Sequence, residues 1–154
     1  GLLNKRSFNK YKNNVEEEKV ALIVFDVNDF KLINDKYGHS EGDRILIEVA
    51  RMLKEYYQKY GRVYRLGGDE FAALIEKSID KNKVEQIATI FKEKIEERNE
   101  ELRKGEKLEI PRISYGISVY NHENRLEHRF EDVIKEADEE MYKYKEKYKN
   151  QNKQ

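Results

Sequence analysis

Three acidic residues stand where carboxylates from distant parts of the chain could act together. Asp26 closes the apolar run KVALIVFDV (19–27), which is short, rich in β-branched residues and therefore predicts a central strand. Asp69 and Glu70 follow the paired glycines of RLGGDEF (65–71). A Gly-Gly pair between two strand-like segments predicts a tight hairpin, because glycine reaches positive φ without steric cost. If the two strands are neighbours, these carboxylates meet at one edge of a sheet.

Such a group of carboxylates suits Mg²⁺, a hard ion that binds carboxylates, backbone carbonyls and phosphate oxygens. The small residues Gly67 and Gly68 would let a triphosphate approach with its metal. Taken alone, Asp26 is equally explained as a strand-ending cap or a salt-bridge partner, and Asp69 and Glu70 as an exposed polar turn. The joint pattern favours the metal site. Neighbouring residues of a regular strand point to opposite sides, so one acid of the pair is expected to be the primary ligand.

The polar segment after Asp26, VNDFKLINDKYGHSEGD (27–43), offers groups for a nucleotide. Lys31 can neutralise phosphate, whereas Asn34 and Asp43 present an amide and a carboxylate that together satisfy the edge of a guanine. Asp43 at the start of a helix is also explained by the helix dipole alone. The chain has no GxxxxGK[ST] run, which excludes a P-loop nucleotide site.

The overall charge gives no reason to expect a polyanionic partner. The chain of 154 residues carries 31 basic and 31 acidic residues, so any anionic ligand must be held by local groups or by a metal. There is no cysteine, which excludes disulfides and thiolate chemistry. No apolar run approaches the roughly 20 residues of a membrane-spanning helix. We therefore expect a cytoplasmic segment that contacts neither nucleic acid nor membrane.

The spacing of apolar residues predicts the elements that position these groups. Helices are expected over 4–14, 40–59, 82–103 and 129–148, and strands over 19–27, 62–66, 70–76 and 112–120. The predicted order includes one further helix between 19–27 and 40–59, and is helix, strand, two helices, two strands, helix, strand, helix, with a fraying tail at 148–154. This order favours a single α+β domain of ferredoxin-like or palm type, in which helices cover one face of a mainly antiparallel sheet.

Two long motifs resemble the GGDEF-domain family, the diguanylate cyclases of bacterial signalling. They are FDVNDFKLINDKYGHSEGD (25–43) and YRLGGDEFAAL (64–74). GLLNKRSF (1–8), ISYGISVY (113–120) and EADEEMYKYKEKYKN (136–150) resemble the start, the central strand and the final helix of that family. The resemblance covers nearly the whole chain, 1–154, as one domain. It implies a longer protein with an upstream regulatory region, which could be anchored in a membrane.

The family implies a nucleotide-cyclase-like fold and the condensation of two GTP into cyclic di-GMP and two pyrophosphates. Mg²⁺, with Mn²⁺ as a substitute, would be held by Asp26, the carbonyl of Val27 and Asp69. Asp69 would also accept the proton of the attacking 3′-hydroxyl. Glu70 and Lys31 complete the catalytic residues that the resemblance implies.

The substrate-binding residues follow from the same match. Asn34 and Asp43 would read the guanine, and His39 would line the pocket or hold the turn. The spacing of Lys145 and Lys149 places both on one helix face, where they would bind phosphates, although a solvated basic tail is the alternative. The full set is Asn34, His39, Asp43, Phe30, Gly67, Gly68, Lys145 and Lys149. Each domain would hold one GTP, so catalysis would require a homodimer.

The chain departs from the family pattern at several positions. An inhibitory RxxD motif for the product is replaced by QKYG (58–61), so we expect no product inhibition through that site. Asn28 stands where an aspartate is common. The final arginine of the family is Lys149, which keeps the charge but loses the bidentate fork, and the preceding glycine is Tyr148.

Three other functions remain open at this point. The first is a GTP-binding regulatory module that no longer turns over, against which the intact Asp26 and GGDEF run argue. A cyclase that makes mixed cyclic dinucleotides is the second, although Asp43 favours guanine. A product-binding effector is the least favoured, because the RxxD motif is missing.

Overall fold

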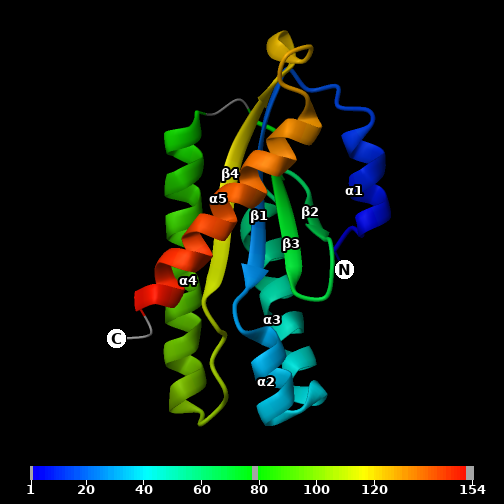
Figure 1. Ribbon diagram of the computed structural model, residues 1–154. Helices are drawn as coiled ribbons and strands as arrows, with labels where there is room; N and C mark the ends of the chain where they lie inside the picture. The colour runs from blue at the N-terminus through cyan, green and yellow to red at the C-terminus, as the bar shows by residue number, and fades with distance from the viewer. Residues whose placement is uncertain (1, 78–79, 152–154) are drawn as a thin grey trace.

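A four-stranded antiparallel sheet with helices packed around it forms the domain (Figure 1). The computed structural model describes residues 2–77 and 80–151. In chain order the elements are α1 (Lys5–Lys12), β1 (Lys19–Val27), α2 (Phe30–Tyr37), α3 (His39–Tyr57), β2 (Val63–Arg65), β3 (Glu70–Ile75), α4 (Lys81–Lys104), β4 (Ile113–Asn121), a short 3₁₀ helix (His122–Asn124) and α5 (Phe130–Gln151). The sheet order is β2-β3-β1-β4. The predicted α+β class and the order of the elements are confirmed.

Helices cover both faces of the sheet rather than one. Side chains of β1 alternate between two apolar clusters: Ile23 and Phe25 pack with residues of α3 and α4, whereas Leu22 and Val24 pack with residues of α1 and α5. Eight of the nine residues of β1 are buried, because the strand has a layer on either side. An unbroken apolar run, in place of an alternating one, is the signature of such a strand.

The last helix extends further than predicted. α5 runs to Gln151, so the expected fraying is wrong for 148–151, whereas 152–154 lie outside the described residues. An aromatic contact explains the difference, because the ring centroids of Tyr148 and Tyr144 lie 4.6 Å apart. Contacts of this kind hold a terminal turn that the polar sequence alone would not hold.

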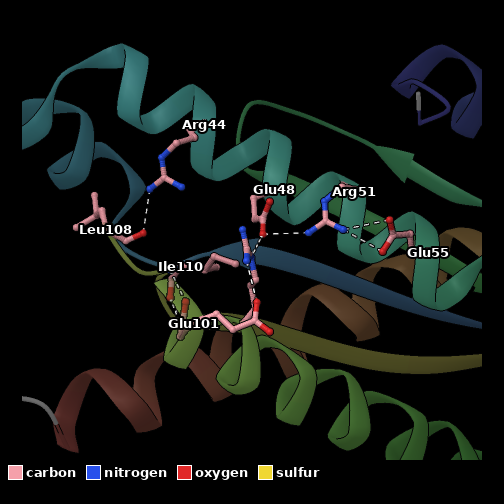
Figure 2. Close-up of polar contacts among 9 residues, drawn as sticks. Arg44, Glu48, Arg51, Glu55, Glu101, Leu108 and Ile110 are labelled. Carbon is pink, nitrogen blue, oxygen red and sulfur yellow. Dashed lines mark hydrogen bonds and ion pairs between the residues drawn. The ribbon is translucent and has the colours of Figure 1, made fainter. Parts of the chain in front are cut away.

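Hydrogen bonds and ion pairs fasten α3 to α4 and to the segment that leads into β4 (Figure 2). Arg44 donates to the carbonyl of Leu108 at 2.9 Å. Glu48 accepts from Arg51 and from Arg98. The buried Asn99 donates to the carbonyl of Ile110 at 2.9 Å and accepts from its N–H at 2.7 Å. The backbone just before β4 is therefore held in place from α4.

α5 packs unusually close to β4, and Gly116 makes this approach possible. A Cβ atom at position 116 would lie 2.0 Å from the carbonyl oxygen of Ala137 and 2.5 Å from the amide nitrogen of Met141. Both atoms belong to the backbone of α5, so neither can move without shifting the helix. The close packing sets the height of α5 above the sheet.

Replacing this glycine should therefore destabilise the domain. We expect Gly116→Ala to lower the free energy of unfolding by about 1–3 kcal/mol, measured by urea titration, because the added methyl group overpacks a backbone contact. Gly105→Ala is the matched control, since its nearest atoms would be 3.7 Å away. That variant should stay within about 0.5 kcal/mol of the unmodified chain. Equal stability of the two variants would contradict the packing argument.

Candidate active site

The predicted convergence of acidic residues occurs at one end of β1. Asp26 lies opposite Glu70 on β3 and opposite Ser114 on β4. The N–H of Val27 donates to the carbonyl of Asp69 at 3.1 Å, which places the tip of the hairpin beside the end of the central strand. The antiparallel register therefore brings residues more than 40 positions apart to a single edge.

Asp26 is the buried member of this group. Only 8% of its surface is exposed, and its Oδ2 accepts a hydrogen bond of 2.8 Å from the Nζ of Lys145 on α5. Burial raises the pKa of the Asp26 carboxyl, the Lys145 ammonium opposes that rise, and the charges of Asp69 and Glu70 add to it. The net pKa is raised. The negative charges of Asp69 and Glu70 thus act on the Asp26 carboxyl.

More acidic side chains act on the Lys145 ammonium than the sequence predicted. Its pKa is raised by the hydrogen bond to Asp26 and by the charges of Asp26, Asp69 and Asp29. Asp29 was not predicted as a site residue. It adopts a left-handed conformation, with φ of 55°, directly before α2. No local pattern in the sequence marks that conformation, although Asp tolerates it better than most residues.

The hairpin tip differs from the prediction in its backbone. Neither Gly67 nor Gly68 has a positive φ, so the expected conformational reason for the glycine pair is wrong. The tip is instead held by Arg65, whose guanidinium donates to the carbonyls of Gly67 at 3.2 Å and of Gly68 at 2.8 Å. A Cβ at position 68 would meet nothing within 4 Å. The described structure therefore sets no steric requirement for a glycine at position 68.

The donors at this edge suit a hard divalent cation, but they do not form a complete site by themselves. Carboxylate oxygens of Asp26 and Asp69 are ligands that Mg²⁺ prefers. Within residues 2–77 and 80–151, no group of three Asp, Glu, His or Cys side chains is arranged to hold a metal. The carbonyl of Val27 or oxygens of a ligand would have to complete the coordination.

A second group of predicted residues meets where α2 packs against α3. The Oδ1 atom of Asn34 is buried and has no hydrogen-bond partner in the described part of the chain. It sits against Gly42, where a Cβ would lie 1.8 Å from that oxygen and 3.1 Å from the ring of Phe30. A buried acceptor without a donor is costly, which points to a donor that a ligand would bring. Asp43 follows Gly42 and is exposed.

The remaining predicted residues are accessible from solvent. Lys31 and His39 are exposed at the first turns of α2 and α3, and Lys149 is exposed near the end of α5. Lys145 is partly buried against Asp26. The geometry thus shows two clusters, an acidic edge with a lysine and the buried amide of Asn34 against Gly42, connected by the first turn of α2.

Comparisons with known proteins identify the family of this chain. The chain matches the family described as "Diguanylate cyclase, GGDEF domain" over residues 1–151. It belongs to that family. It is 40% identical over 94 residues to diguanylate cyclase DgcN of Escherichia coli K12, which is 58% of this chain and 23% of that protein. It is 28% identical to a membrane protein of Staphylococcus haemolyticus, matching 98% of this chain and 43% of that protein. The GGDEF domain described here therefore spans less than half of these relatives.

Solved structures show the same fold. The active GGEEF domain of a diguanylate cyclase from Vibrio cholerae aligns with a TM-score of 0.74 and 24% identity, covering 96% of this chain and 93% of that one. The GGDEF domain of DgcB from Caulobacter crescentus, solved in complex with c-di-GMP, aligns with a TM-score of 0.78 and 22% identity, covering 94% and 86%. In the described part of this GGDEF domain, every helix is too short or too polar to cross a membrane.

Two departures from the family pattern have visible structural consequences. The Oδ1 of Asn28 accepts a hydrogen bond of 2.8 Å from Ser114, so this side chain ties the end of β1 to β4. At position 61, a Cβ would lie 2.0 Å from the carbonyl oxygen of Leu74. A side chain at position 61 would therefore require the backbone around Leu74 to shift.

A cavity of about 470 Å³ lies beside the site, between α4 and the segment before β4. Its lining includes Ile33, Phe91, Ile110 and Arg112, but none of the site residues predicted from the sequence. The buried acceptor of Asn34 and the interacting charges of Asp26, Asp69 and Glu70 lie outside this cavity.

The raised pKa of Asp26 predicts a pH-dependent cost to stability. A carboxyl whose pKa is higher in the folded than in the unfolded state binds its proton more tightly when folded, so its ionisation destabilises the fold. In metal-free buffer at pH 7, we expect Asp26→Asn to be at least as stable as the unmodified domain. The advantage should shrink as the pH falls through the raised pKa toward 3.8.

The measurement is the free energy of unfolding from urea titrations at several pH values. Lys145→Met serves as the opposing variant, because it leaves Asp26 buried without its cation. That variant should be less stable than the unmodified domain at pH 7 and should recover at acidic pH. An Asp26→Asn domain that is clearly less stable at pH 7 would show that the ion pair outweighs the cost of burial.

Proposed function

We propose that this GGDEF domain condenses two GTP molecules into cyclic di-GMP and two pyrophosphates, with Mg²⁺, as one half of a homodimer. The observation that carries the proposal is the meeting of Asp26, Asp69 and Lys145 at one edge of the sheet, together with a buried acceptor on Asn34 that has no donor within residues 2–77 and 80–151. Charged groups of both signs together with an unsatisfied amide match the needs of a nucleoside triphosphate.

The buried amide oxygen of Asn34 supports guanine as the base. Guanine presents an N1–H and an exocyclic N2 amine along one edge, and both are donors. The Oδ1 of Asn34 can accept from such an edge, and the carboxylate of Asp43 can accept a second bond. Adenine presents an acceptor at N1, so it would leave one of these oxygens unpaired. A site built to pair with a donor discriminates strongly against a ligand that lacks it.

The acidic edge supports binding of the triphosphate and its metal. Asp26, Asp69 and the carbonyl of Val27 would hold the ion, and Lys31 and Lys145 would bind phosphate oxygens. Mg²⁺ bound there would supply a Lewis acid that favours ionisation of the 3′-hydroxyl and offsets the charge on the α-phosphate. Reactions of this type depend mainly on positioning and electrostatic stabilisation.

The chemical step requires two copies of the domain. The 3′-oxygen of one GTP attacks the α-phosphorus of the other, the bond to the β-phosphate breaks, and pyrophosphate leaves. Asp69 would accept the proton released by the hydroxyl, with Glu70 beside it. The same exchange in the opposite direction closes the ring. We place this reaction in the cytoplasm, where GTP is available, including when a longer protein is anchored in a membrane.

A second candidate is a regulatory module that binds GTP without turning it over. Its support is that the described residues provide no ready group of three metal-binding side chains. The two candidates separate in one experiment. The domain is fused to a dimeric coiled coil and incubated with GTP and Mg²⁺, and the products are analysed by mass spectrometry. Cyclic di-GMP supports the cyclase. Tight GTP binding without product supports the module, and a mixed dinucleotide formed from GTP plus ATP would show relaxed base selection.

Removal of the carboxylate at the hairpin tip should abolish synthesis. We expect Asp69→Ala, in the fused dimer, to reduce the rate of cyclic di-GMP formation by at least about 100-fold, because it removes both a metal ligand and the proton acceptor. Its thermal midpoint should barely change, since Asp69 lies on the hairpin tip and packs against little. Glu127→Ala, which removes an exposed carboxylate from a remote loop, is the control. An Asp69→Ala domain with full activity would disprove the assignment.

Filling the space beside Asn34 should weaken nucleotide binding without harming the fold. We expect Gly42→Ala to lower the affinity for GTP by about tenfold, measured by calorimetry, because the methyl group displaces the Asn34 oxygen. Alanine favours a helix over glycine by about 1 kcal/mol, which offsets part of the cost of shifting the Asn34 side chain, so the variant should stay folded, and its thermal midpoint checks this. Gly105→Ala should leave the affinity unchanged. Unaltered binding in Gly42→Ala would place the base elsewhere.

A further inference from the structure

Three tyrosine rings form a ladder from the edge of the sheet to the end of α5. The centroids of Tyr115 and Tyr144 lie 4.8 Å apart, and those of Tyr144 and Tyr148 lie 4.6 Å apart. The ammonium of Lys92 on α4 lies 4.9 Å from the centroid of Tyr148. The guanidinium of Arg112 lies 4.2 Å from the same centroid, well inside the range of a cation–π contact.

The backbone holds Arg112 next to the acidic edge. Its carbonyl accepts a hydrogen bond of 2.9 Å from the N–H of Asn28, two residues after Asp26. Asn99 fixes Ile110 on the other side through two buried hydrogen bonds. The start of the segment that carries Arg112 is therefore fastened to α4, and its end is fastened to the loop after β1.

The aromatic ring that contacts Arg112, Tyr148, lies on the same part of α5 as Lys145. Tyr148 follows Lys145 by three positions on α5, so the two side chains share a helix face. Lys145 reaches the Oδ2 of Asp26 at 2.8 Å. The stacked guanidinium therefore lies one helical turn beyond the lysine that meets the acidic edge.

The stacked guanidinium keeps its hydrogen-bonding capacity. The guanidinium carries five N–H donors, and its contact with Tyr148 is a cation–π contact rather than a hydrogen bond. The side chain of Arg112 is exposed, and in residues 2–77 and 80–151 no carboxylate lies within ion-pairing distance of it. A planar fork held in one orientation is suited to bidentate binding of a phosphate.

We propose that Arg112, oriented by Tyr148, binds the terminal phosphates of the nucleotide and makes this site select a triphosphate. The inference rests on the proposed function, because it assumes that GTP binds across the acidic edge. Lys149 carries a point charge that cannot form a bidentate contact, and the guanidinium of Arg112 offers a fork from the segment before β4 instead of from α5. Arg112 is thus a binding residue and Tyr148 a positioning residue.

The test compares two ligands that share the base but differ in their phosphates. The probes are GMP and a GTP analogue with a methylene group between the α- and β-phosphates, each measured by calorimetry with Mg²⁺. Arg112→Ala should bind the analogue about tenfold more weakly than the unmodified domain, while its affinity for GMP stays unchanged. Arg112→Lys should lose part of the preference, since it keeps the charge without the fork.

A matched pair of variants tests the Tyr148 ring. Tyr148→Phe keeps the aromatic face and should retain the preference for the analogue over GMP. Tyr148→Leu keeps the apolar bulk but removes the face, and it should lose the preference as Arg112→Ala does. Thermal midpoints of all variants show whether each is folded. A merely structural role would lower the midpoint without changing the ratio of the two affinities.

The outcomes distinguish this inference from the function on which it rests. If the unmodified domain prefers the analogue and Arg112→Ala keeps that preference, the role of Arg112 is disproved and the proposed function stands. Equal losses for both ligands in Arg112→Ala also disprove it, because the effect is then not on the terminal phosphates. An unmodified domain that binds neither ligand overturns the proposed function, and this inference with it.

Discussion

A buried carboxylate at the end of the central strand is the constraint on which the site depends. Asp26 lies at the end of β1 with 8% of its surface exposed, and a charge in that position is costly without a partner. The partner is Lys145, delivered by a helix that crosses β4 at close range because Gly116 has no side chain. The packing of α5 on β4 therefore determines where the Lys145 ammonium lies relative to Asp26. A change in the height of α5 alters the cation beside Asp26.

The same ion pair leaves an excess of negative charge at this edge of the sheet. Asp26, Asp29 and Asp69 all act on the Lys145 ammonium, which carries one positive charge against several negative ones. The imbalance leaves the edge favourable for a further cation, and the lysine and a divalent ion would share the oxygens of Asp26. Under the proposed function, a triphosphate bound with its metal would give Lys145 new acceptors. Cation binding and phosphate binding are therefore expected to support each other at this edge.

Local patterns in the sequence predicted much of the fold and the core of the site. The run 19–27 and the motif 65–71 indicated strands whose ends meet, and the register of Asp26 with Glu70 confirms it. The prediction failed where the cause lies in tertiary contacts. Arg65 holds the hairpin tip in place of glycine conformations, and Asp29 enters the acidic group through a left-handed backbone. Neither contact has a local periodicity or composition that could reveal it.

The end of α5 shows most clearly why single positions cannot be judged alone. Against the family pattern, Tyr148 and Lys149 look like two independent losses, one of helix-end shape and one of a guanidinium fork. In space, Tyr148 lies beneath Arg112, a residue 36 positions away on the segment before β4. An aromatic ring in place of glycine creates a surface on which a guanidinium from another element can be oriented. If Arg112 binds the phosphates as we propose, the two departures are one rearrangement, in which the guanidinium fork comes from the segment before β4 instead of from α5.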